Sequence, residues 1–282
     1  MRCQLGVGEV SLEQISFILP FSARRRQMQS LAVLSRLPAF LAVSFLVLAL
    51  PGCQPPPPAP APAAPLAVVS PLPADLAAAL DAFRAEGPKG WAFTQSTTGG
   101  GRDRVERYDP SRRGPARWTL LSEKGRAPTE TEQQRYRDTR PPFDAAANLA
   151  SQLDRASATL VARDGQSATY EFALVPAGEH DTAAAHMRAR FTQDAATGAF
   201  TRVELFNFQP FKAATSLTIQ EARTTLLYAP PSGGRPALPL ETSLHVRGTR
   251  FWLSNFHQEV VSKFSDQADM SAAAAGAHSP SP

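Results

Sequence analysis

The sequence predicts an α+β protein built on one large, curved antiparallel sheet, an incomplete β-barrel, which short helices cap. From Trp91 onward, apolar residues recur with a period close to two, as is typical of strands. Tight-turn dipeptides such as Asp164-Gly165 separate these runs, as in successive hairpins. Few stretches show the period of a helix. Because a single sheet of roughly eight to ten strands must curl, we expect helices near 75–86 and 129–153 to cover its hollow.

The first predicted helix covers residues 73–86. Leu76, Leu80 and Phe83 recur at positions i, i+4 and i+7 and form one apolar stripe. Gly87-Pro88 follows directly and ends the helical pattern. We therefore expect the helix to turn this stripe toward the hollow of the sheet.

Three short strands and a second helical region follow. The strands are predicted over 91–95, 105–108 and 117–122. Thr129 and Glu132 then have the spacing of a capping box, in which the two side chains satisfy backbone N–H groups at a helix start. We expect one short helix from there through about Arg137, and another over 144–153.

The second half of the chain alternates strands and turns more regularly. Turns are predicted at Asp164-Gly165, at Thr197-Gly198, at 232–234 and at Arg247-Gly248. The strands expected between them cover 159–162, 168–174, 185–191, 200–208, 217–228, 241–246 and 249–261. No internal repeat is visible, so these strands belong to a single domain.

Residues 1–52 have the pattern of a secretory signal segment. Three arginines, Arg24–Arg26, precede an uncharged apolar run from Leu37 to Leu50. This run is shorter than the roughly 20 residues that a membrane-spanning helix needs. A signal that begins at Met28 is already complete, so we expect translation to start there and not at Met1.

The apolar run ends at Cys53, which we predict to be lipidated. Leu50-Pro-Gly-Cys53 resembles the bacterial lipobox, in which a lipid is attached to the cysteine, although Pro51 departs from that pattern. Cys3 lies in the segment that would be removed, so Cys53 would have no disulfide partner. The alternative is a simple signal peptide, or an uncleaved anchor, with an incidental cysteine.

Residues 53–73 are predicted to link the lipid to the folded domain. Seven prolines occur between Gln54 and Pro65 and stiffen the chain as an extended spacer. Gln54 is not the aspartate that retains lipoproteins in the inner membrane of well-studied bacteria. We therefore expect a lipid-anchored protein of the bacterial cell envelope that faces the periplasm, at the outer membrane.

The composition of the mature chain argues against a nucleic-acid partner. Removing the five arginines and two glutamates of residues 1–52 leaves 24 basic and 23 acidic residues, so the mature chain is nearly neutral. Binding to a phosphate backbone would require an excess of basic residues. The stretch 266–282 is rich in Ala, Ser, Gly and Pro, and we expect it to be a disordered tail.

No catalytic motif or metal site emerges, so we expect neither an enzyme nor a cofactor. The sequence lacks the signatures of serine hydrolases, P-loop proteins, dinucleotide-binding folds and zinc proteases. The histidines His180 and His186 do not have the spacing of metal ligands. Glu204 and Glu221 would make a carboxylate pair, but salt bridges to Arg202 and Arg223 are the interpretation we favour.

Phenylalanines are densest between residues 200 and 211. Phe200, Phe206 and Phe208 share parity along one predicted strand and so would lie on one face. Together with Phe251 they are the residues we expect to line an apolar, ligand-binding hollow. The alternative is that they belong to an ordinary core between sheet and helix.

Residues 74–265 resemble the LolA/LolB-like family of lipoprotein-sorting proteins. The phrases that carry this resemblance are 187–192 with 198–205, 238–248 with Phe251-Trp252, and Lys263-Phe-Ser-Asp266. The segment from Tyr108 to Gly125 is more similar to secreted relatives of that family than to the lipoprotein chaperones. The resemblance implies an incomplete barrel whose hollow holds acyl chains, or a sensor domain.

Two functions follow from this resemblance. The first is a non-enzymatic protein, anchored by its lipid, that binds a lipid or an acylated ligand in the hollow. The second is an envelope assembly or sensing module that binds a protein partner on the same fold. A co-purified phospholipid would favour the first, and a lipid-free mass with a captured envelope protein would favour the second.

Overall fold

The computed structural model of the chain describes residues 67–68, 71–85, 87–139, 149–176 and 181–271. All of them belong to one compact unit. Cys53, the signal segment, the segment 144–148 and residues 272–282 lie outside the described residues, so the expectations placed on them stay predictions.

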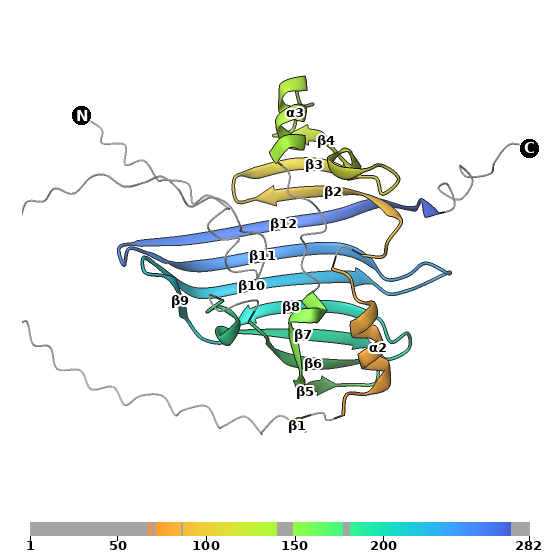
Figure 1. The fold of residues 1–282 in the computed structure, drawn as a ribbon, viewed down its shortest axis with the longest axis vertical. Coiled ribbons are helices and arrows are strands. Elements are labelled where there is room, and N and C mark those ends of the chain that lie inside the picture. Colours follow the sequence, from red (N-terminus) through yellow and green to blue (C-terminus); the bar gives the residue numbers. More distant parts are fainter. Residues whose placement is uncertain (1–66, 69–70, 86, 140–148, 177–180, 272–282) are drawn as a thin grey trace, which may run out of the picture. The chain divides into compact units, whose positions relative to one another are not determined.

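One antiparallel sheet of 12 strands dominates the described chain, in the order β1-β5-β6-β7-β8-β10-β11-β12-β2-β3-β4, with β9 paired to β10 (Figure 1). The sheet is open, because its end strands β1 and β4 do not pair with each other. The predicted class, α+β with a large antiparallel sheet, is thus confirmed at this level. The strands are β1 (Ala67–Val68), β2 (Trp91–Gly99), β3 (Arg102–Tyr108), β4 (Trp118–Glu123), β5 (Leu153–Arg163), β6 (Ser167–Leu174), β7 (Met187–Asp194), β8 (Phe200–Asn207), β9 (Phe211–Ala214), β10 (Leu217–Ala229), β11 (Leu238–Arg250) and β12 (Ser254–Asp269).

The first predicted helix is present as α2 (Ala74–Ala82). Leu76 and Leu80 are fully buried, and Phe83, at the end of the helix, is nearly so. The stripe therefore packs as the period indicated, although the helix ends before Gly87. Strand β1 pairs with β5, so the predicted linker 53–73 includes a short strand.

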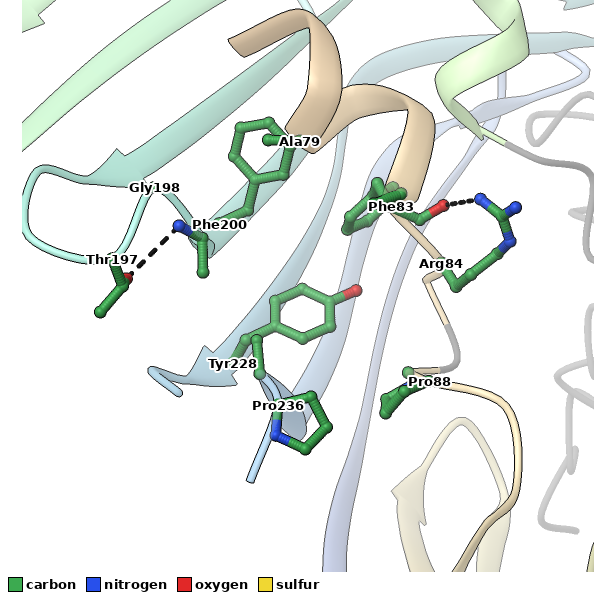
Figure 2. Close-up of a pocket in the computed structure, with 13 residues that line it drawn as sticks. Ala79, Phe83, Arg84, Pro88, Thr197, Gly198, Phe200, Tyr228 and Pro236 are labelled. Atoms are coloured by element: carbon green, nitrogen blue, oxygen red, sulfur yellow. Dashed lines mark hydrogen bonds between the residues drawn. The ribbon is translucent and has the colours of Figure 1, made fainter. Parts of the chain in front are cut away.

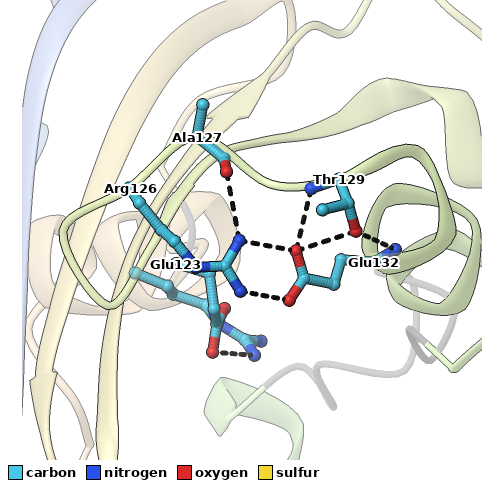
Figure 3. A network of polar contacts seen from close by, with 6 residues as sticks. Glu123, Arg126, Ala127, Thr129 and Glu132 are labelled. Atoms are coloured by element: carbon cyan, nitrogen blue, oxygen red, sulfur yellow. Dashed lines mark hydrogen bonds and ion pairs between the residues drawn. The ribbon is translucent and has the colours of Figure 1, made fainter.

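The capping box is also present, at the start of α3 (Glu130–Thr139). The backbone N–H of Glu132 donates to Thr129 Oγ1 at 3.3 Å, and the N–H of Thr129 donates to Glu132 Oε2 at 2.8 Å (Figure 3). Arg126 also donates two hydrogen bonds to the Glu132 carboxylate. Hydrogen bonds first from Arg126 and then from Thr129 lower the pKa of Glu132 to about 2.

The predicted turn at Arg247-Gly248 is wrong, because β11 runs straight through it to Arg250. A side chain at position 248 would meet the carbonyl oxygen of Thr218 at 2.3 Å and the ring of Phe256 at 2.7 Å. The glycine is therefore needed for close packing across the sheet and not for a reversal of the chain. The chain reverses three residues later, at Phe251-Trp252-Leu253.

Two further expectations about element boundaries need correction. Strand β12 continues to Asp269, past the point at which the disordered tail was predicted to begin. The described end of the predicted helix 144–153 is a 3-10 turn, Leu149–Gln152, and Leu153 already starts β5. Tertiary pairing with β6 decides this last boundary, since Leu153 pairs with Leu174.

A bulge in β8 changes which phenylalanines share a face. Gln193 of β7 pairs with Phe200, whereas the preceding Thr192 pairs with Arg202, so Thr201 is the extra residue. The bulge puts Phe200 on the same face as Val203 and Leu205, and Phe206 on the opposite face. The prediction that Phe200, Phe206 and Phe208 lie together is therefore wrong.

The buried apolar residues form two separate clusters on the sheet. The larger, which we name the α2 cluster, joins α2 to the strands β5, β6, β7, β8 and β10. The smaller, the α3 cluster, consists of Phe93, Trp118, Leu120 and Tyr136, with Tyr108 and Phe264 packed against it. Residues of the α2 cluster also line the pocket described below.

Candidate ligand pocket

A pocket of about 310 Å³ opens where the end of α2 meets the turn between β7 and β8 and the start of β11 (Figure 2). Its volume lies at the lower end of the range that small-molecule sites occupy. The residues around it are mainly apolar. They are Ala79, Ala82, Phe83, Arg84, Gly87, Pro88, Thr197, Gly198, Ala199, Phe200, Tyr228, Pro236 and Ala237.

Three aromatic rings line the pocket on its inner side. The ring of Phe83 meets those of Phe200 and Tyr228 edge to face, each at a centroid distance of 5.8 Å. The Tyr228 hydroxyl donates to the carbonyl oxygen of Ala85 at 2.9 Å. Because this polar atom already has a partner and the rings brace one another, the inner side offers a ligand a rigid apolar surface.

The turn between β7 and β8 forms one edge of the pocket, and its shape is fixed by local hydrogen bonds. Asp194 Oδ1 accepts from the backbone N–H and the hydroxyl of Thr197, at 2.8 and 2.7 Å. These bonds lower the pKa of Asp194, the side-chain bond first. Gly198 has a φ of +69°, which glycine adopts without strain. The predicted turn at Thr197-Gly198 is thus confirmed.

Arg84 is the one charged residue among those that line the pocket. Its guanidinium is turned back on the end of α2, where it donates to the carbonyl oxygen of Phe83 at 2.6 Å (Figure 2). It also donates to the carbonyl oxygen of Asp81 at 3.0 Å. The arrangement is an apolar interior with a cation close by. Such a site suits an apolar chain that ends in an anionic group, since the chain buries apolar area and the cation attracts the charge.

Beyond this pocket, the space between α2 and the sheet is filled by the protein's own side chains. Leu76, Leu80, Phe172 and Phe191 are all fully buried. The rings of Phe172 and Phe191 meet edge to face at a centroid distance of 5.8 Å. The α2 cluster therefore has the close packing of a protein core in the part that these side chains occupy.

Of the four phenylalanines predicted to line one hollow, Phe200 alone lines this pocket. Phe206 is buried on the other face of the sheet, where the guanidinium carbons of Arg190 and Arg223 lie 4.5 and 5.4 Å from its ring centroid. Phe208 is 46% exposed beside Arg188. Phe251 is 57% exposed at the tip of the β11–β12 hairpin. The structure does not bring these four residues together.

Sequence reasoning missed most of the pocket. Phe83 was predicted to lie on the apolar stripe of the first helix and Pro88 to end that helix, but neither these residues nor Tyr228 and Pro236 were predicted as part of a site. The residues that line the pocket come from three parts of the chain, the end of α2 with Gly87 and Pro88, the β7–β8 turn, and the end of β10 with Pro236 and Ala237, and no one of these parts predicts a site by itself. Only the pairing of the strands brings them to one end of the sheet.

Glu204 and Glu221 do not act as a carboxylate pair. Glu204 accepts hydrogen bonds from Arg202 at 2.9 Å and from Arg223 at 3.0 Å, as the favoured interpretation predicted. Burial raises the pKa of Glu204, but the bonds and charges of the two arginines outweigh it and leave the pKa below its usual value. Glu221 instead pairs with Arg247 at 3.3 Å and lies 3.7 Å from His245.

The described residues contain no group of three or more His, Cys, Asp or Glu side chains that could hold a metal ion. His186 stacks on Phe211 at a centroid distance of 5.1 Å, and its Nδ1 lies 3.0 Å from the amide nitrogen of Gln209. His180 lies outside the described residues. Within the part of the chain that the structure describes, no helix has the length and hydropathy to cross a membrane.

In comparisons with known proteins, no family model, no curated protein and no solved structure matches this chain. The resemblance to the LolA/LolB-like family therefore rests on the sequence phrases given above, and the pocket has to be interpreted from its own chemistry.

Proposed function

We propose that this protein is a lipid-anchored bacterial envelope protein that binds one acyl chain, of a lipid or an acylated ligand, in the pocket at the end of α2. The observation that carries the proposal is the pocket's lining, which joins three braced aromatic rings to a single nearby cation. No catalytic group is needed for such a role, because each CH₂ removed from water contributes about 0.8 kcal/mol.

Two other features support the proposal. The lipobox-like sequence at Cys53 and the proline-rich spacer agree with a lipid anchor, which would hold the domain next to a membrane, where acyl chains are available. We also propose that the open antiparallel sheet with α2 packed on one face is a LolA-like half-barrel. In this version of the fold, side chains occupy most of the space under the helix, so the ligand is a single chain and not a complete lipid anchor.

The proposal is tested by photolabelling the full chain in its native membranes with a diazirine-bearing fatty acid. We expect labelled peptides from α2, from the β7–β8 turn and from the start of β11. Ala79→Phe places a ring in the pocket and is expected to lower the labelling about tenfold, which corresponds to about 1.4 kcal/mol.

Ala78→Phe provides the matched control, because Ala78 is exposed on the same helix and does not line the pocket. Its labelling should equal that of the wild type. Equal labelling of the wild type and Ala79→Phe would sink the proposal. A lipid-free native mass, together with a captured envelope protein, would favour the alternative of an assembly or sensing module.

A further inference from the structure

Three large apolar side chains stand in solvent at the tip of the β11–β12 hairpin. Phe251, Trp252 and Leu253 are 57%, 75% and 92% exposed, and they are consecutive in the sequence. The tip lies at the opposite end of β11 from the pocket, which Pro236 and Ala237 border at the start of that strand (Figure 1). Packing within the described fold therefore does not account for these side chains.

The backbone of the tip is unfavourable for the residues that it carries. Phe251 and Trp252 have φ values of +51° and +62°, and the N–H of Leu253 donates to the carbonyl oxygen of Arg250 at 3.2 Å. Positive φ at both central residues is typical of a type I′ turn, for which Asn-Gly is the favoured sequence. Bulky side chains in this conformation add strain, and a polar turn would fold more easily.

The surroundings of the tip carry positive charge. The segments 211–219 and 247–257 flank it in the sheet and contain Lys212, Arg247 and Arg250 but no aspartate or glutamate. The nearest carboxylate in the neighbouring strand, that of Glu221, forms an ion pair with Arg247 at 3.3 Å, so these two charges offset each other and the positive charge near the tip comes from Lys212 and Arg250. An exposed apolar tip with cations behind it is complementary to a membrane surface that bears anionic headgroups.

We propose that the Phe251–Leu253 tip inserts into the interface of an anionic lipid bilayer and gives the domain a second membrane contact, separate from the pocket and from Cys53. Tryptophan and phenylalanine favour the boundary between headgroups and acyl chains. A turn projects its side chains outward in several directions. A fluid interface accommodates this convex shape more readily than a preformed protein groove does.

Tryptophan fluorescence of the full chain tests the proposal directly. The protein is reconstituted into phosphatidylcholine–phosphatidylglycerol vesicles whose acyl chains carry bromine, a contact quencher. The chain has three tryptophans, at positions 91, 118 and 252. We expect bromine to quench the wild-type emission, and this quenching to be lost in Trp252→Phe, which removes only the reporter. Trp91→Phe is the control and should retain the quenching, because Trp91 starts β2 at the other end of the sheet.

A second variant separates insertion from folding. Phe251→Ser with Leu253→Ser keeps the Trp252 reporter but removes its two apolar neighbours, and we expect bromine quenching to fall to the level of Trp252→Phe. Phe251→Asn with Trp252→Gly installs the favoured turn and should raise the midpoint of chemical unfolding. Equal bromine quenching of the wild type and Trp252→Phe would overturn the proposal. Shielding of Trp252 from acrylamide only when a soluble envelope protein is added would do the same, and would point to a protein partner.

Discussion

Helices α2 and α3 pack on different parts of the same sheet, and the clusters they form differ in size and in chemistry. Among the described residues, the α2 cluster contains 23 buried residues and the α3 cluster contains four. Helix α2 contributes Leu76 and Leu80 with no solvent exposure, whereas Tyr136 is the one buried residue of α3. Apolar burial therefore holds α2 in place, and α3 needs another source of stability.

That source is a set of directional polar contacts. The Tyr136 hydroxyl donates to Glu106 Oε1 at 2.7 Å, and the Gln133 side chain donates to the carbonyl oxygen of Leu120. The capping box adds the bonds between Thr129 and Glu132 (Figure 3). Each such bond contributes only about 1 kcal/mol, so the α3 end depends on several of them together. The comparison shows how one sheet can use two kinds of stabilisation.

Polar residues also fill part of the strands between the two clusters. Thr97 of β2 and Ser262 of β12 are buried, and their hydroxyl oxygens lie 2.9 Å apart. The Gln95 amide donates to both hydroxyls at 3.2 Å. The apolar core is thus interrupted at the junction of β12 and β2, which is why two clusters form instead of one.

The largest effect is expected from Phe191→Ala in the α2 cluster. Its ring meets those of Phe200, Phe83 and Phe172 at centroid distances of 4.9, 5.4 and 5.8 Å. Removing it leaves a cavity in a packed core, and the free energy of unfolding should fall by about 3–5 kcal/mol in urea denaturation. The exposed Leu253→Ala serves as the control, with a change within about 0.5 kcal/mol. A loss no larger than the control would contradict a close-packed α2 cluster.

A smaller effect is expected from Tyr136→Phe in the α3 cluster. The change removes the bond to the Glu106 carboxyl and should lower the free energy of unfolding by about 1–3 kcal/mol. Amide hydrogen exchange should quicken in α3 and β4 but not in β7 and β8. Tyr228→Phe is the matched control, because it loses a bond to a neutral carbonyl and should cost about 0.5–1.5 kcal/mol. If Tyr228→Phe lost more free energy of unfolding than Tyr136→Phe, the α3 cluster would not be the one that depends more on polar contacts.

The smallest effect is a pH dependence confined to the start of α3. Because the pKa of Glu132 is about 2 in the folded chain and ordinarily 4.5, its contribution is present above pH 4.5 and is lost as the pH falls toward 2. The Thr129 amide resonance should titrate with a midpoint near this pKa. Glu132→Gln should abolish this titration. A midpoint near 4.5 in the wild type would show that the pairing with Arg126 does not form in solution.

The positions of most helices and strands could be predicted from the sequence, but few of the contacts between them could. The stripe of Leu76, Leu80 and Phe83 and the capping box of Thr129 and Glu132 are local patterns, and both predictions are confirmed. The prediction of a turn at Arg247-Gly248 was wrong, because glycine occurs both in turns and at positions where neighbouring groups approach the backbone closely. At position 248 it permits the approach of Thr218 and Phe256, which no local pattern reveals.

The candidate site was less predictable than the fold. Phe200 was predicted to line the ligand site and does line the pocket, but the bulge at Thr201 puts it on the opposite face of the sheet from Phe206. Parity along a strand assumes an unbroken period of two, and a single extra residue reverses every later assignment. Phe251 was predicted to line the hollow. The turn in which it lies contains neither glycine nor asparagine, so the sequence pattern did not reveal a turn there.

By itself, the sequence determined the α+β class, the packed stripe of α2, the cap of α3 and most of the strands, because short-range sterics and periodic burial control these features. The predictions of a signal segment and of a lipid on Cys53 also rest on the sequence alone. Only the tertiary structure decided which side chains meet at the pocket, which face Phe206 occupies and where the last hairpin turns. These depend on register and on contacts between distant segments, and a local pattern holds no information about either.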